Sequence, residues 1–124
     1  MIDPRRAFGN SGEDLAAAFL ERLGMTVLDR NVDTFAGEAD IVAEDKGEIV
    51  FVEVKTRQSG EFGWPEESIT PPKFRRMQLT AEAILEKRGW EKRFWRLDVI
   101  AIRIRDGLDP EIVHLKAVDK PYGG

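Results

Sequence analysis

The stretch GEADIVAEDKGEIVFVEVKTR, residues 37–57, most constrains the fold, because it has the pattern of two strands joined by a tight turn. Side chains alternate across a strand, so residues 48–55 present three valines on one face and Phe51, Glu53 and Lys55 on the other. The valine face indicates burial, which is typical of a strand in the middle of a sheet. Charges on a central strand require a structural or chemical reason.

The register of this hairpin decides whether Asp40 lies on the same face of the sheet as Glu53. With Asp45 and Lys46 as the central turn residues, Asp40 opposes Phe51 and lies on the face of Glu53, diagonally displaced by about 7–8 Å between Cα atoms. A loop one residue longer or shorter would reverse this parity. The sequence therefore predicts two neighbouring carboxylates, conditional on the turn.

A helix before the hairpin supplies a third acid. We expect it over about 12–23, with Ser11 as its N-cap and Gly24 at its end. Glu13 falls at the edge of the apolar arc, whereas Asp14 points well away from it. Glu13 is thus predicted to face the sheet.

Convergence of Glu13, Asp40 and Glu53 would be electrostatically unfavourable. Two like charges at ~4 Å repel by roughly 4 kcal/mol at an effective dielectric constant of 20. A surface ion pair contributes only about 0–1 kcal/mol to stability, so Lys55 alone does not offset the repulsion. Either one acid stays protonated, or a divalent cation lies between the carboxylates. The structural alternative is a solvated strand edge whose charges block aggregation.

Composition restricts the metal chemistry. The chain has no Cys and a single His, His114, which excludes thiolate and histidine-rich zinc sites. No nucleophile motif accompanies His114, so a Ser-His-Asp triad is also excluded. Carboxylate ligands favour hard cations such as Mg²⁺ or Mn²⁺.

The remaining pattern completes one mixed α/β domain of 124 residues, with a core over about 11–118 and loosely held ends. No apolar run approaches the ~20 residues of a membrane helix, and the N-terminus has no signal-peptide pattern, so we expect a cytoplasmic protein without membrane association. The element order is α-β-β-β-α-β-β, a sheet of about five strands flanked by helices. The further elements are a strand near 25–31, a helix from Thr70 to near Gly89, and strands over 93–104 and 111–118.

A formal net charge of −4 gives no general attraction to nucleic acid, so binding requires a local basic patch. Lys73 and Arg76 lie on one stripe of the second helix, and Arg57 follows the hairpin. Together with Arg93 and Arg96 they could form a basic rim that contacts phosphates without reading sequence. The alternative is an ordinary solvated helix face.

Three residues outside this constellation have simpler interpretations. Trp64, in a loop rich in glycine and proline, is the tryptophan available to a ligand. Asp98 is interpreted as scaffold, paired with Arg96 or a helix N-terminus. His114 is interpreted as a half-buried or edge histidine.

Four ordered segments resemble a known family: GEDLAAAFLERLGMTVLDRN, GEADIVAED, VFVEVKTR and RLDVIAI, spread over residues 12–102. They are similar to the bacterial YraN-like family, small uncharacterised proteins assigned to the restriction-endonuclease-like fold. Asp40, followed by Glu53-x-Lys55, also resembles the Asp…Glu-x-Lys signature of nucleases with that fold, which include Holliday junction resolvases.

The resemblance implies a nuclease dependent on Mg²⁺ or Mn²⁺ that acts on structured or damaged DNA. Asp40 and Glu53 match the metal-binding acids, Glu13 matches a helical glutamate of resolvase-like members, and Lys55 matches the residue near the attacking water. A strand carbonyl, such as that of Val54, and waters would complete the metal shell.

Two other readings remain open at this point. The first is a non-catalytic nucleic-acid-binding or protein-interaction module on the same fold. The second is a subunit active only as a homodimer or with a protein partner.

Overall fold

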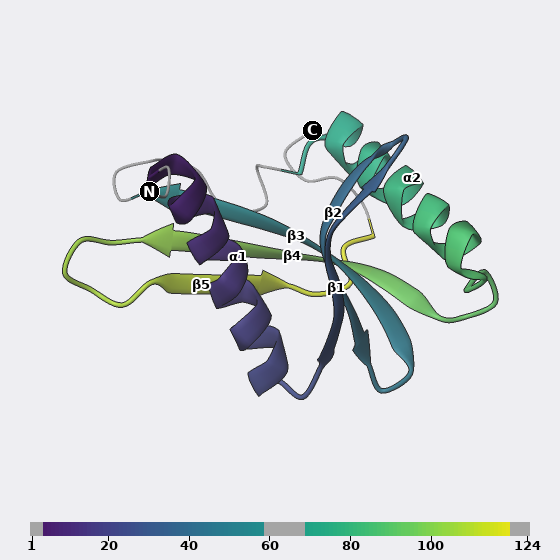
Figure 1. Ribbon diagram of the computed structural model, residues 1–124, viewed down its shortest axis with the longest axis horizontal. Coiled ribbons are helices and arrows are strands. Elements are labelled where there is room, and N and C mark those ends of the chain that lie inside the picture. Colours follow the sequence, from purple (N-terminus) through teal and green to yellow (C-terminus); the bar gives the residue numbers. More distant parts are fainter. Residues whose placement is uncertain (1–3, 59–68, 120–124) are drawn as a thin grey trace.

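The computed structural model describes residues 4–58 and 69–119, with side chains from Gly12 onward in the first helix. The order α-β-β-β-α-β-β is confirmed, and Figure 1 shows the twisted sheet with its two helices. The elements are α1 (Pro4–Arg22), β1 (Thr26–Thr34), β2 (Gly37–Asp45), β3 (Glu48–Gln58), α2 (Pro71–Arg88), β4 (Trp95–Ile104) and β5 (Glu111–Leu115).

The five strands lie in the order β1-β2-β3-β4-β5, so β3 is the central strand, as its valines predict. Strands β3 and β4 are parallel, and the other neighbours are antiparallel. A parallel pair needs a long crossover, and α2 provides it. Among the described residues, no helix is long and apolar enough to cross a membrane.

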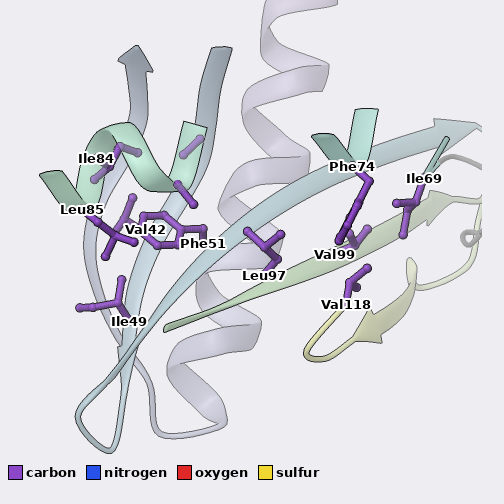
Figure 2. Close-up of a cluster of buried hydrophobic side chains, with 12 residues drawn as sticks. Val42, Ile49, Phe51, Ile69, Phe74, Ile84, Leu85, Leu97, Val99 and Val118 are labelled. Carbon is purple, nitrogen blue, oxygen red and sulfur yellow. The ribbon is translucent and has the colours of Figure 1, made fainter. Parts of the chain in front are cut away.

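The core forms two layers, one on each face of the sheet. Val50 and Val52 pack against Leu20 of α1, whereas Phe51 packs into the layer of α2. Figure 2 shows this second layer, in which Ile84 lies near Phe51. The predicted alternation of β3 is therefore confirmed. Glu53 lies on the same face of β3 as Phe51, which is the face covered by α2.

Helix α2 has the predicted ends. Thr70 caps its N-terminus, where the side-chain hydroxyl accepts a hydrogen bond from the backbone N–H of Lys73 at 3.4 Å. Pro71 occupies the first turn, where its missing N–H costs little. Gly89 ends the helix in the left-handed conformation, with φ 70°. These local signals place Lys73 in the first turn of α2.

The turn between β2 and β3 differs from the prediction. Asp45 pairs with Glu48, so the central turn residues are Lys46 and Gly47, with φ values of 52° and 88°. A two-residue hairpin turn of this kind needs positive φ at both central positions, which glycine adopts without steric cost. The predicted turn, centred on Asp45 and Lys46, is therefore wrong by one position.

This correction shifts the register by two residues. Phe51 pairs with Val42 and not with Asp40. Because the shift is even, it leaves the predicted parity of the two strands unchanged. The observed pairing of the two strands reaches Ile41 and Val52, and Asp40 contacts β3 beyond it through its side chain, which accepts a hydrogen bond from the Val54 backbone N–H.

Strand β2 also changes its alternation at Asp40. Ala39 and Val42 pack into the layer of α2, whereas Ile41 packs into the layer of α1. On the neighbouring strand Asn31, which the register places opposite Asp40, has φ 53°. Asp40 therefore lies at a local irregularity of the sheet, as residues at functional sites often do.

Helix α1 begins at Pro4, eight residues before the predicted start. Ser11 thus lies inside the helix and is not its N-cap. Proline is tolerated in the first turn, and the arginines and alanine that follow it favour a helix. The helix also runs through Gly12, which is buried against β3, and this tertiary contact has no signature in local sequence.

Gly12 lies where α1 packs closely against Thr56 of β3. A Cβ atom at this position would lie 2.1 Å from the Thr56 hydroxyl oxygen and 3.2 Å from its Cβ. We expect Gly12→Val to lower the free energy of unfolding by about 1–3 kcal/mol, because overpacking forces the helix outward. Urea denaturation measures this loss. Ala18→Val on the same helix is the control, and an equal loss in both variants would contradict the proposed contact.

Candidate metal site

Three carboxylates converge at the irregular point of β2. Oxygen atoms of Glu13, Glu38 and Asp40 all lie within 4.8 Å of one another. Glu13 comes from α1, and the other two come from β2. The structure thus brings together two of the three predicted metal-binding acids. Sequence reasoning missed Glu38, whose position two residues before Asp40 was the available signal.

Asp40 carries the strongest electrostatic perturbation of the group. Burial, together with the negative charges of Glu53, Glu13 and Glu38, raises its pKa to about 7, against a hydrogen bond from Val54 that acts to lower it. That bond runs from the Val54 backbone N–H to Asp40 Oδ2 at 2.8 Å and ties β2 to β3. The role of the Val54 carbonyl as a ligand stays a prediction.

Glu53 lies beside this trio but is paired with a lysine. Lys73 Nζ is 3.3 Å from Glu53 Oε1, and the Lys73 side chain is only 11% exposed. Burial and the neighbouring amino group of Lys55 lower the pKa of Lys73 to about 8, while the negative charge of Glu53 opposes both effects. Glu53 and Lys55, both on β3, therefore meet Lys73 of α2.

Glu13 also has a cation partner. Arg30 of β1 lies 3.6 Å from Glu13 and 2.8 Å from Asp14. Across the side chains that the structure describes, no ion pair joins Asp40 to a cation. Among the described side chains, the carboxylate with the largest electrostatic penalty is thus left without a cation partner.

A cavity of about 340 Å³ opens at this cluster. Its acidic side consists of Glu38, Asp40 and Glu53, and its opposite side belongs to α2. The α2 residues that line it are Lys73, Arg76, Met77 and Thr80. An acidic floor facing basic side chains can accept a cation on one side and a phosphate on the other.

The oxygen donors fit a hard divalent cation. Carboxylates are the ligands that Mg²⁺ and Mn²⁺ prefer, and they are present here without sulfur or imidazole ligands. The raised pKa of Asp40 indicates negative charge that the protein itself does not neutralise. Either a proton or a cation can neutralise that charge, so the arrangement is compatible with a metal site.

The predicted basic rim is only partly present. Lys73 and Arg76 line the cavity, and Arg57 lies half-buried on β3 with interactions of its own. Arg93 instead binds Glu44 and the backbone of the β2–β3 turn. Its inclusion in a phosphate-binding rim is therefore wrong. Trp64 lies outside the described residues.

Arg96 is likewise a structural residue and not part of a rim. Its guanidinium group, 8% exposed, pairs with Asp98 at 3.0 Å, Glu48 at 2.6 Å and Asp45 at 3.1 Å. Asp98 is completely buried and also contacts the His114 ring nitrogen at 2.8 Å. The interpretation of Asp98 as scaffold paired with Arg96 is confirmed, and its contact with His114 was missed.

The raised pKa of Asp40 gives a pH dependence of stability. Between about pH 4 and pH 7 the folded wild type holds a proton that the unfolded chain has lost, so stability falls as pH rises through this window. Without metal, Asp40→Asn should exceed the wild type by about 1–2 kcal/mol at pH 8, less than a full shift implies because Asp40 is partly exposed. The difference should shrink as pH falls and vanish below about pH 4.

Urea denaturation in the presence of a chelator, at several pH values, measures this difference. Asp106→Asn, in an exposed turn, is the control for removing one negative charge. A wild type that is as stable as Asp40→Asn at pH 8 would show that Asp40 is not strained by its neighbours.

Known proteins of the same family match most of the chain. The model of the uncharacterised protein family UPF0102 matches residues 12–102. A UPF0102 protein of Syntrophotalea carbinolica is 44% identical over 114 residues, covering 92% of both chains. One of Geobacter sulfurreducens is 46% identical over 110 residues, covering 89% of this chain and 86% of the relative. One of Desulfitobacterium hafniense is 39% identical over 123 residues, covering 95% and 100%. The chain therefore belongs to the uncharacterised protein family UPF0102, the YraN-like family that its motifs resemble.

Proposed function

We propose that this protein is a metal-dependent nuclease that hydrolyses phosphodiester bonds in structured or damaged DNA. The observation that carries the proposal is the arrangement around Asp40, whose carboxylate has acidic neighbours and no cation partner among the described side chains. The likeness of Asp40, Glu53 and Lys55 to the nuclease signature supports the same conclusion.

Glu13, Glu38 and Asp40 would hold the cation, Mg²⁺ or Mn²⁺, and Glu53 of the same cavity would be a further ligand. When bound, such a cation lowers the pKa of water and neutralises charge on a phosphate. The hydrogen bond from the Val54 backbone N–H fixes the orientation of the Asp40 carboxylate, because it holds Oδ2 against β3. This bond would preorganise the site for the cation.

Lys55 would act on the reacting phosphate. It follows Glu53 by two residues on β3, so both side chains belong to one face of that strand. A lysine next to a phosphate can orient the attacking water and stabilise the negative charge that develops during the reaction. These two roles require a side chain that reaches the cavity, and the effect of Lys55 on the pKa of Lys73, a residue of the cavity lining, is consistent with that.

The substrate would contact the protein through its phosphates. Lys73 and Arg76 form the basic side of the cavity, and Arg57 lies further along β3. Such contacts give salt-dependent binding without reading bases, which suits a substrate recognised by its shape. A homodimer or a protein partner would add basic surface to a chain of net charge −4, and the proposed location is the cytoplasm.

A cleavage screen with Mn²⁺ tests the proposal. Branched, flapped, nicked and linear DNA substrates are incubated with the wild type and with the double variant Asp40→Asn/Glu53→Gln. We expect cleavage of at least one structured substrate by the wild type and none by the double variant, because removing both acids removes the cation site.

The double variant also controls for a contaminating nuclease, which would cut in both samples. Equal cleavage by both proteins would therefore contradict a nuclease centred on these acids. Binding of DNA without cleavage by either protein would favour the non-catalytic module.

A further inference from the structure

Lys73 has an unusual environment for a residue expected to contact DNA. It lies in the first turn of α2, but its side chain is 11% exposed and turned toward β3. Its Nζ atom lies 3.3 Å from Glu53 Oε1. In this structure, therefore, the ammonium group neutralises a carboxylate and is not displayed to solvent.

The pairing of Lys73 has a counterpart on the other side of the site. Arg30, on β1, lies 3.6 Å from Glu13. The two outer acids thus each have a cation from the protein, whereas Asp40 between them has none among the described side chains. Protein cations occupy the two flanks of the position where a divalent cation would bind.

A metal ion and Lys73 would compete for Glu53. A carboxylate oxygen binds Mg²⁺ or Mn²⁺ at about 2.1 Å, and an ammonium group 3.3 Å from that oxygen would be strongly repelled by the ion. Lys73 also forms part of the cavity lining, together with Arg76. The lysine can therefore leave Glu53 without leaving the cavity.

We propose that Lys73 is a positioning residue that takes the place of the cation at Glu53 in the metal-free protein, and that a bound cation displaces it into the cavity. This inference rests on the proposed function. Once displaced, the ammonium group is free to bind a phosphate of the substrate. Metal binding and phosphate binding are then coupled through one side chain, and by linkage each strengthens the other.

Titration with Mn²⁺ at pH 7, followed by electron paramagnetic resonance of the free ion, tests the competition. Lys73→Gln should bind Mn²⁺ about three- to fivefold more tightly than the wild type, the factor that a partly exposed ion pair represents. Lys73→Arg, which keeps the charge, should bind as the wild type does. Arg75→Gln, an exposed change on the same helix, controls for the general loss of one positive charge.

Each outcome of this titration has a distinct meaning. Equal or weaker binding by Lys73→Gln would overturn the competition, and so would an equal gain in Arg75→Gln. If Lys73→Gln does not fold, as judged by circular dichroism, Lys73→Met replaces it, because it keeps most of the apolar stem. A wild type that binds no Mn²⁺ would instead overturn the proposed function itself.

The coupling is tested separately with Ca²⁺, a divalent cation that binds the same oxygen ligands. Fluorescence anisotropy measures binding of a labelled flapped DNA with and without Ca²⁺. The ion should tighten DNA binding by the wild type and have a weaker effect on Lys73→Gln. Equal coupling in the two proteins would overturn the release of Lys73 toward the phosphate.

Discussion

Replacing Arg96 with methionine should lower the free energy of unfolding by about 3–5 kcal/mol, the usual cost of leaving a buried charge without its partner. Arg96 is 8% exposed and holds three carboxylates, those of Asp45, Glu48 and Asp98. Asp98 is completely buried, so water cannot compensate for the lost guanidinium group. The network also joins the β2–β3 turn to β4, so its loss should destabilise the sheet as a whole and not only the turn. Urea denaturation at pH 7 measures it.

Arg103→Met on the same strand provides a matched control. Arg103 pairs with Glu111 at 3.9 Å, but both side chains are more than 40% exposed, at 43% and 49%. An exposed ion pair contributes about 0–1 kcal/mol, so this variant should be close to the wild type. Similar losses in the two variants would mean that the effect of Arg96 is not one of buried charge.

The same network predicts a pH dependence of opposite sign to that of Asp40. Burial acts to raise the pKa of Asp98, but hydrogen bonds from His114, Ala117 and Arg96 outweigh it and the net pKa is lowered. Its contribution to stability is therefore complete above the ordinary value near 3.8 and is lost as pH falls below it. The stability difference between the wild type and Arg96→Met should accordingly be smaller near pH 3 than at pH 7.

Lys55→Ala should reduce DNA cleavage by about 100-fold or more while Mn²⁺ binding is retained. Removing one group that stabilises developing charge costs about 10²–10³ in rate. Carboxylates, and not Lys55, would bind the ion. Removing the Lys55 side chain should therefore leave the metal ligands in place. Single-turnover cleavage measures the rate, and electron paramagnetic resonance measures binding of the ion.

Lys92→Ala, an exposed change in the loop after α2, is the control for the lost positive charge. It should cleave at the rate of the wild type. Cleavage retained by Lys55→Ala would remove this lysine from the mechanism, whereas loss of Mn²⁺ binding would show that it supports the ligands instead.

Features of the fold that depend on local patterns were predictable from the sequence. The apolar run of Val50, Phe51 and Val52 identified a central strand, because burial on both faces of a sheet requires apolar side chains at consecutive positions. Thr70 and Gly89 marked the ends of α2 through backbone groups that any helix leaves unpaired.

The candidate site was predictable to the same extent. Asp40 and Glu53 are acids in otherwise apolar strands, and Glu13 lies at the edge of an apolar helical arc. These positions follow from the periods of strand and helix. Glu38 was missed although it lies only two residues before Asp40, because its neighbours on β2 gave no reason to prefer it.

Apart from the pairing of Asp98 with Arg96, the ion pairs could not be predicted from the sequence. Lys73 was predicted to contact DNA, but it pairs with Glu53 on β3, and Arg96 binds three acids from the hairpin and its own strand. A long charged side chain selects its partner only after the backbone is in place, since several acids lie within its reach.

The sequence by itself determined the element order, the burial of β3 and the carboxylates that face one another, because each depends on periodicity over a few residues. Tertiary structure alone decided how closely α1 approaches β3 and which cations lie beside the acids. Those outcomes depend on contacts between distant segments, such as Gly12 against Thr56 and Lys73 against Glu53, whose energies exceed the local preferences that a sequence displays.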